Sequence, residues 1–221
     1  MHLARPAFRK LESTLKAGFT LIELLAVILI IGILMTFLLP RIPEAIDHAK
    51  VTACRKNMQE IYNGLNLYYA KFNRAPNQSG VKFFAMLIDK GCFDNTDAVV
   101  KKLTCPGVDI GVLELNNIPD PKQWFVPLDK VDGRYSSYAG RNCKEFPLRS
   151  WPPGSDEVLV SDDNDPSMNH RTSTVYLLGD GSAATFELKD DKIRALLGPD
   201  VNVLVVGKDS PVPELRKLSL D

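Results

Sequence analysis

The chain has 221 residues, of which 45% are hydrophobic, with 27 basic and 27 acidic side chains. This length supports one packed domain with an additional segment, but it is short for two full domains. The balanced charge lacks the basic excess that is typical of nucleic-acid-binding proteins, so we expect no nucleic-acid partner.

The four cysteines form no C-x-x-C pair and have no histidine at the spacing of a zinc site, which argues against zinc. The simplest expectation is that the four cysteines are buried or free thiols. If the domain is exported to an oxidising compartment, one disulfide within a loop-rich region is the alternative, and the sequence leaves its pairing open. The candidates for that disulfide are Cys92, Cys105 and Cys143, and the fourth cysteine is Cys54.

An apolar run extends from Phe19 to Leu39 and follows a head that carries four basic residues and one acidic residue. As a helix the run would be about 31 Å long, enough to span a bilayer, and the basic head fits a cytoplasmic flank. An ordinary secretory signal is a poorer explanation, because the run is longer than usual and ends in Leu-Leu-Pro-Arg instead of a small-residue cleavage site. An uncleaved anchor would gain nothing from Glu23, whose carboxylate costs up to roughly 3 kcal/mol in hydrocarbon.

Residues 16–23, KAGFTLIE, resemble the prepilin signature of type IV pilins and type II secretion pseudopilins, and Pro40 stands where many members have a proline. The resemblance implies that prepilin peptidase cuts the bond between Gly18 and Phe19 on the cytoplasmic side and N-methylates Phe19. Glycine suits this position, because without a Cβ the backbone can approach a catalytic site closely. The apolar run would then remain in the mature protein.

The resemblance also implies that Glu23 acts in filament assembly, by pairing with the amino terminus of Phe19 on a neighbouring subunit in the filament core. The implied partners are prepilin peptidase, copies of this chain, other pilin-like subunits and the inner-membrane assembly platform. The implied location is the bacterial inner membrane, crossed once, with the C-terminal domain in the periplasm. From there the chain would be extracted into a periplasmic or surface filament.

From Ile42 to Phe72 apolar residues recur mostly every three or four positions, which is typical of an amphipathic helix. We expect this helix to continue the membrane segment past a weak stretch between Gly32 and Pro40, and to pack on a globular domain. The expected organisation is a leader at 1–18, a membrane and filament-core helix at 19–40, the amphipathic half at 41–73 and a periplasmic α+β domain at 74–221.

After residue 73 the sequence predicts short helices and a small antiparallel sheet, so the expected fold class is α+β and pilin-like, with the long helix packed on the sheet. The tail 208–221 is expected to be loosely attached. The predicted helical segments are 81–92, 97–103 and 192–197. The predicted strands are 158–160, 174–179, 182–188 and 201–206. Residues 104–157 are expected to be irregular, with brief strand candidates at 111–115 and 124–128.

Asp180-Gly181 lies between two β-rich runs and favours a two-residue type I′ hairpin turn. That turn would place Val175 opposite Phe186, on a face that we expect to lie on the long helix. The same face would also include Leu177 and Ala184.

His170 precedes Asp180-Gly181 by nine intervening residues, which is similar to the His-x9-Asp-Gly pattern of a group of pseudopilin-like proteins. We expect these residues to serve folding, because a lone histidine before a strand is more often a hydrogen-bonded structural residue than a ligand. Asp180 also has a role in the turn that explains its presence. A catalytic or metal-binding role for His170 and Asp180 is the alternative.

The run from Ser161 to Asp165 is rich in side-chain oxygens, and the major pseudopilins of type II secretion hold calcium in a loop near their C-terminal strands. Asp162, Asp163 and Asp165 are therefore candidate calcium ligands. The run lacks the glycine turns and spaced ligands of a dedicated calcium site, so we expect no cofactor, with calcium as the alternative.

No nucleophile–base pair, glycine-rich phosphate loop or metal-binding helix motif appears in the sequence, so we expect no enzyme. The leading hypothesis is a structural subunit of a type IV pilus-like or type II secretion pseudopilus filament. The alternative is a bitopic membrane-anchored protein whose periplasmic domain binds a ligand or senses a signal. Glu23 and the cleavage signature favour the filament, since neither helps a monomeric anchor.

Overall fold

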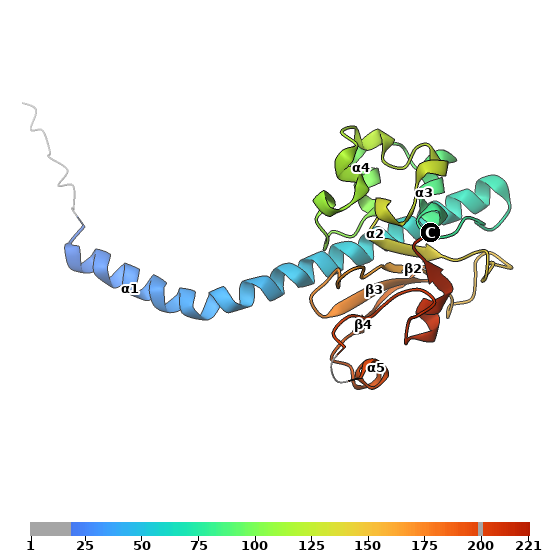
Figure 1. The fold of residues 1–221 in the computed structure, drawn as a ribbon. Helices are drawn as coiled ribbons and strands as arrows, with labels where there is room; N and C mark the ends of the chain where they lie inside the picture. The colour runs from blue at the N-terminus through green and yellow to red at the C-terminus, as the bar shows by residue number, and fades with distance from the viewer. Residues whose placement is uncertain (1–18, 199–200) are drawn as a thin grey trace, which may run out of the picture. The chain divides into compact units, whose positions relative to one another are not determined.

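The computed structural model describes residues 19–198 and 201–221. The chain divides into two compact units, an N-terminal one that ends at Glu44 and a larger one from Ala45 to Asp221. Figure 1 shows the elements of both units along the chain. The expected leader, 1–18, lies outside the described residues.

The N-terminal unit consists of α1 (Leu21–Leu38), the 3-10 segment η1 (Leu39–Arg41) and the first residues of α2 (Ile42–Phe72). None of the α1 side chains is buried. Pro40 explains η1, because its ring removes one backbone hydrogen bond and clashes with the preceding turn. Among the described residues one helix, Leu21–Phe72, is long and apolar enough to cross a membrane by length and composition.

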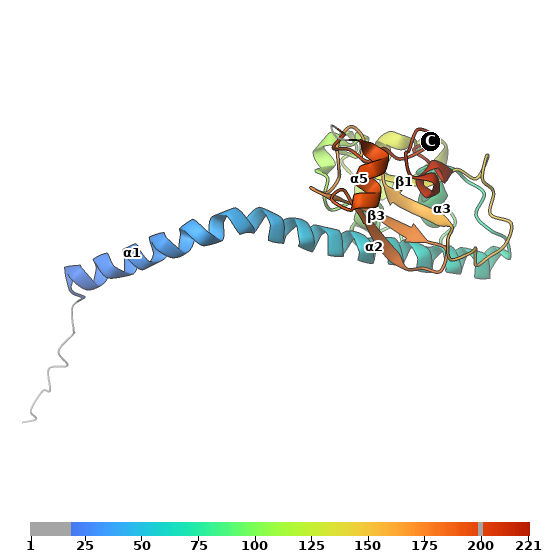
Figure 2. The same cartoon turned by 90° about the horizontal axis from the view of Figure 1, so that it is seen from below.

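In the larger unit α2 packs along one face of a five-stranded antiparallel sheet, as Figure 2 shows from below. The fold class is therefore α+β, as predicted. The strand order is β4-β3-β2-β1-β5, with β1 at Tyr138–Arg141, β2 at Val158–Asp162, β3 at Ser173–Leu178, β4 at Ala183–Glu187 and β5 at Leu218–Ser219.

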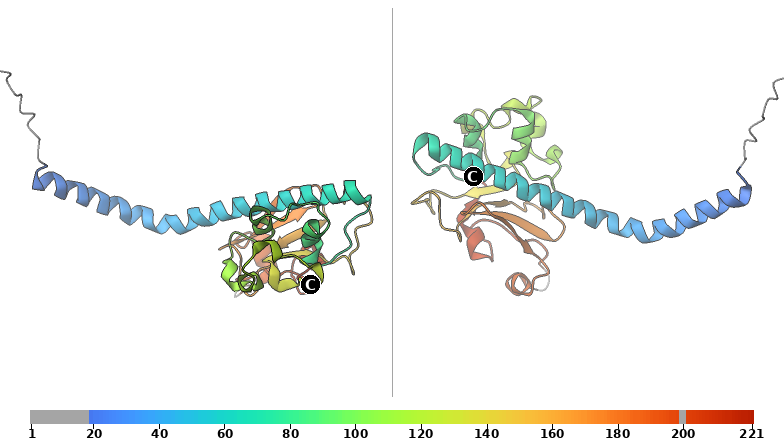
Figure 3. Two further views of the ribbon diagram at one scale, coloured as in Figure 1. Left: turned by 90° about the horizontal axis from the view of Figure 1, so that it is seen from above. Right: turned by 180° about the vertical axis from the view of Figure 1, so that it is seen from behind.

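The core under α2 is formed by the second half of the predicted stripe, whereas Ile42 and Ile46 in its first half are exposed. Met58, Ile61 and Leu65 are completely buried and Tyr68 is nearly so. They contact the sheet and the short helix α3 (Lys82–Asp89), in which every residue from 83 to 88 is buried. The two views of Figure 3 show α3 and the following irregular region beside α2.

The β3–β4 hairpin has a different register from the predicted one. Its loop has three residues, with Gly181 N–H donating to the Leu178 carbonyl at 3.0 Å and only Gly181 at positive φ, +85°. The type I′ prediction was wrong, because it needed positive φ at Asp180 as well, whereas the observed loop needs it at glycine alone. Val175 consequently pairs with Thr185.

The change of register moves Phe186 to the opposite face of the sheet, since side chains alternate along a strand. Val175 and Leu177 remain in the core against α2, as predicted. Phe186 instead stacks on Tyr176 with ring centroids 4.3 Å apart, in a second apolar cluster that includes residues of α5 (Asp191–Leu197). The predicted contact of Phe186 with the long helix was therefore wrong.

The C-terminal tail is firmly attached, so the prediction of a loose tail was wrong. A 3-10 segment, Pro213–Lys217, leads into β5, which pairs with β1, and Leu215 is fully buried in the second cluster. The Glu157 carboxylate also accepts hydrogen bonds from Lys217 and Arg141. Pro213, which suggested a loose segment, stands at the start of the 3-10 turn, where its missing N–H costs nothing.

The irregular region between α3 and β2 contains short 3-10 turns in place of the brief strand candidates. Asp109 and Asp120 accept backbone N–H groups two residues later and so begin such turns. The strand predicted at 201–206 is also absent, and β1 within this region was not predicted. The other elements here are α4 (Asp97–Val100) and the 3-10 segments Lys101–Leu103, Ile110–Val112, Glu114–Asn117, Pro121–Gln123, Leu128–Lys130 and Gly133–Tyr135.

Candidate functional site

Glu23 lies in the first turn of α1 and forms a capping box with Thr20. Its Oε2 accepts hydrogen bonds from Thr20 N–H at 2.8 Å and from Thr20 Oγ1 at 2.7 Å, while Glu23 N–H donates to Thr20 Oγ1 at 3.3 Å. This reciprocal pair satisfies donors that a helix start otherwise leaves free. The Glu23 carboxylate is thus held at the N-terminus of the apolar helix by the backbone N–H and the hydroxyl of Thr20.

The surface around Glu23 is apolar on every side of α1. The exposed fractions of its large hydrophobic side chains run from 46% at Val27 to 81% at Leu21. A helix that is hydrophobic all round belongs in a protein interior or in a membrane. This surface therefore needs lipid or other helices as its environment.

The expected processing site is the bond between Gly18 and Phe19. Phe19 is the first described residue and is 81% exposed, while Gly18 lies outside the described residues. Cleavage between them and methylation of Phe19 stay predictions. The role of Glu23 in assembly also stays a prediction.

Asp180 and Gly181 lie in the β3–β4 turn, at the opposite end of β3 from His170. The Asp180 carboxylate accepts Ser182 N–H at 2.9 Å and Ser182 Oγ at 2.6 Å. A Cβ at Gly181 would lie 2.5 Å from the ring of Tyr62, whose hydroxyl donates to the Gly179 carbonyl. The turn therefore rests on α2, which agrees with a role in folding.

Asp180→Asn is expected to keep the stability of the protein, because the amide oxygen can accept the same two hydrogen bonds. Asp180→Ala removes the acceptor and should cost about 1 kcal/mol. Urea unfolding of the detergent-solubilised chain, followed by tryptophan fluorescence, measures both. If asparagine cost as much as alanine, the negative charge would matter and the turn role would be insufficient.

His170 is buried in a cluster that the sequence did not predict. Its Nε2 lies 3.3 Å from Cys105 Sγ and 3.6 Å from Asp162 Oδ2. Cys54 Sγ completes the group, 3.9 Å from Cys105 Sγ and 3.4 Å from Asp162 Oδ1. The four residues come from four separate segments of the chain, and the two cysteines alone are 51 residues apart. No local sequence motif could therefore reveal the cluster.

Burial dominates the electrostatics of this cluster. It raises the pKa of Cys54 and of Cys105, so without a nearby cation both thiols stay protonated. Burial also raises the pKa of Asp162, against the opposing effects of the nearby His170 imidazole and of Val175 N–H, which donates to Oδ2 at 2.7 Å.

The three candidate calcium ligands do not lie in one exposed loop. Asp162 is fully buried and faces the cysteines, while Asp163 is 7% exposed and accepts Asp165 N–H at 3.4 Å. Burial raises the pKa of Asp163 to about 7. Calcium binding at these residues stays a prediction.

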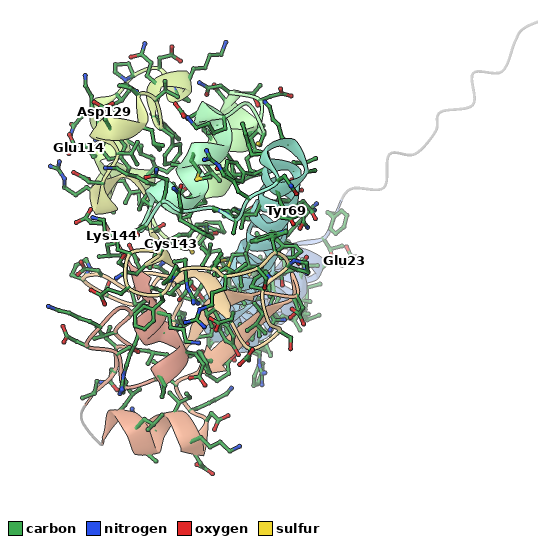
Figure 4. The ribbon with its side chains drawn as sticks, turned by 90° about the vertical axis from the view of Figure 1, so that its right-hand side faces the viewer. Glu23, Tyr69, Glu114, Asp129, Cys143 and Lys144 are labelled. Carbon is green, nitrogen blue, oxygen red and sulfur yellow. The ribbon has the colours of Figure 1, made fainter. Side chains whose placement is uncertain are left out.

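All four cysteines are free thiols in the structure. Cys105 lies beside Cys54, which was not among its expected disulfide partners. Cys143, labelled in Figure 4 next to Lys144, instead donates to the Pro76 carbonyl at 3.6 Å.

Comparisons with known proteins bear on the N-terminal segment and on most of the chain. Residues 14–39 match the family model described as the prokaryotic N-terminal methylation motif. The chain is 27% identical over 163 residues to type II secretion system core protein G of Pseudomonas aeruginosa. The aligned region covers 70% of this chain and 94% of that protein. No solved structure gives a significant match. The two matches confirm the predicted resemblance to type IV pilins and type II secretion pseudopilins.

Proposed function

We propose that this chain is a structural subunit of a type IV pilus-like or type II secretion pseudopilus filament, assembled through its N-terminal helix. The methylation motif and the similarity to core protein G support a pilus or pseudopilus subunit. The observation that carries the proposal is the combination of a wholly apolar, unburied α1 with a single carboxylate, Glu23, in its first turn.

Processing would supply the positive partner of that carboxylate. Prepilin peptidase removes residues 1–18, which creates an amino terminus at Phe19, and then methylates it. While the chain waits for assembly, α1 lies in the inner membrane and the domain from Ala45 onward is in the periplasm. The assembly platform then moves the subunit from lipid into the filament.

In the filament the α1 helices would pack against one another and replace lipid as the cover of the apolar surface. Lipid tails are as apolar as these side chains, so the hydrophobic effect does not favour one packing of the helices over another. Glu23 is the only charged residue in α1, so it can select one axial offset between neighbours, at which it meets the amino terminus of another Phe19. Other offsets leave a carboxylate unpaired in an apolar environment, which is strongly unfavourable.

A membrane-anchored protein that binds a ligand or senses a signal is the second candidate. Such a protein needs neither leader removal by this peptidase nor a carboxylate in its anchor. Removal of the leader by prepilin peptidase therefore distinguishes the filament subunit from the membrane-anchored binding or sensing protein.

Intact-mass analysis of the chain, co-expressed with and without prepilin peptidase, tests the proposal. With the peptidase the chain should lose residues 1–18 and gain one methyl group at Phe19, and without it the mass should stay that of the full chain. Gly18→Val is the control and should remain uncleaved, because its side chain obstructs close approach of the backbone to the peptidase. A mature chain that starts after Pro40 would instead indicate an ordinary secretory signal.

A further inference from the structure

Four polar side chains form a cluster in the core of the larger unit, where apolar side chains would be enough for packing. Cys54 comes from α2, Cys105 from the loop after α4, Asp162 from the end of β2 and His170 from the loop before β3. Each is at most 2% exposed. One ligand atom from each of the four lies within 4.8 Å of all the others.

We propose that Cys54, Cys105, Asp162 and His170 together bind one zinc ion in a closed structural site. Two sulfurs, one imidazole nitrogen and one carboxylate oxygen are ligands that zinc accepts, and four protein ligands leave no open position for catalysis. The sequence argued against zinc only because each segment supplies a single ligand.

Four separations in the cluster are close to those expected around a tetrahedral zinc ion. Zn–S bonds of about 2.3 Å place two sulfurs about 3.8 Å apart, and shorter bonds to nitrogen and oxygen place the other pairs about 3.3–3.6 Å apart. The observed S–S separation is 3.9 Å. Cys105 Sγ lies 3.3 Å from His170 Nε2. The two Asp162 oxygens have different neighbours, since Oδ1 lies 3.4 Å from Cys54 Sγ and Oδ2 lies 3.6 Å from His170 Nε2. One ligand atom from each residue already lies within 4.8 Å of the others, so adjustment of the side chains, with one Asp162 oxygen turned to the ion, would close the set around zinc.

The groups around the cluster are arranged to support thiolate ligands. Gly107 N–H donates to Cys105 Sγ at 3.3 Å, and the Tyr138 hydroxyl lies 3.3 Å from Cys54 Sγ. Hydrogen bonds of this kind orient metal ligands and stabilise their charge.

The second imidazole nitrogen of His170 gives an independent indication. Nδ1 is buried and makes no hydrogen bond within the described part of the chain, and Asp47 Oδ1 lies 3.9 Å from it. Arg171 N–H donates to the same carboxylate at 3.2 Å and holds it there. If Nε2 binds zinc, Nδ1 carries the proton and faces a carboxylate, which is the usual outer arrangement around a zinc-bound histidine.

Such a site would fasten α2 to the sheet and its loops, because Cys54 is on the helix, Asp162 ends β2 and the other two ligands lie in loops. It is therefore a folding element, in which His170 has the metal-binding role that the sequence left as the alternative to a hydrogen-bonded structural residue. A disulfide between Cys54 and Cys105 would also join these parts. It needs the sulfurs to close from 3.9 Å to about 2.0 Å, and it would leave Asp162 buried without a cation.

The test uses the full chain in detergent, purified without added metal and analysed for metal content. We expect about one zinc ion per chain. Removing it with a chelator should lower the melting temperature by at least about 5 °C, and zinc but not calcium should restore it. Cobalt in place of zinc should give the charge-transfer absorption of a thiolate-bound ion.

Cys54→Ser and His170→Gln should each lose the zinc, whereas Cys92→Ser, which alters a thiol outside the cluster, should retain it. Because the ligand variants could fail to fold, the zinc content and the stability of the parent chain are the deciding measurements. A parent that neither contains zinc nor gains stability from it would overturn the proposal. So would a Cys54–Cys105 disulfide in chain isolated from its native membrane, or stabilisation by calcium alone. None of these results would alter the N-terminal mass, so the filament proposal is tested separately.

Discussion

Glu23→Ala is expected to leave membrane insertion and leader removal intact and to abolish filament formation. The substitution makes α1 more apolar, so insertion does not suffer, and the cleavage signature before Phe19 is unchanged. What it removes is the one charge that can pair with the amino terminus of a neighbouring subunit. Electron microscopy of filaments, together with intact-mass analysis of the same cells, measures assembly and processing in parallel.

Glu23→Gln separates pairing between subunits from the local capping box. Glutamine can accept the hydrogen bonds from Thr20 that the structure shows at 2.7 and 2.8 Å, but it carries no charge. If pairing matters, the glutamine variant should fail to assemble as the alanine variant does. Filaments of normal yield and length from Glu23→Ala would refute the assigned role, and rescue by glutamine alone would assign Glu23 to capping.

Leu65→Ala is expected to destabilise the larger unit by roughly 2–5 kcal/mol, because it leaves a cavity between α2 and the rest of the core. Leu65 is fully buried. Leu67, two residues later on the same helix, is 55% exposed and serves as a matched control. Leu67→Ala should change stability by no more than about 0.5 kcal/mol.

Tryptophan fluorescence during urea unfolding is suited to this comparison, because Trp124 and Trp151 both lie in the larger unit and are the only tryptophans in the chain. The signal therefore reports unfolding of that unit and not of α1. Equal and small effects of the two substitutions would mean that the stripe of α2 does not form the core.

The sequence predicted the features that depend on local patterns. The long, mostly apolar run predicted the membrane-length helix, and the three-to-four spacing from Met58 to Tyr68 predicted the buried face of α2. Local signals also gave α3, α5 and the position of the β3–β4 turn. These elements are governed by periodicity and by turn residues, which neighbouring residues along the chain are enough to show.

Features that depend on contacts distant in sequence were missed or wrong. The register of the hairpin depends on a loop that rests on Tyr62, and the sequence cannot show that contact. β1 has only four residues and is recognisable as a strand through its partners β2 and β5. The tail is held by burial of Leu215 and by Glu157, both of which require the folded sheet.

The candidate sites divide in the same way. Glu23 stands within a contiguous motif and was recognisable from sequence. The Cys54, Cys105, Asp162 and His170 cluster was not, because its members become neighbours only when α2 docks on the sheet.

The most direct measurement of the subunit role is made on the filament itself. Cells that contain prepilin peptidase and an assembly platform are made to overproduce the chain, and sheared filaments are collected, labelled with an antibody against residues 45–221 and analysed by mass. Labelled filaments whose subunit begins at methylated Phe19 are the expected result. Processed chain that stays entirely in the membrane fraction, in cells that assemble other pilin-like filaments, would contradict it.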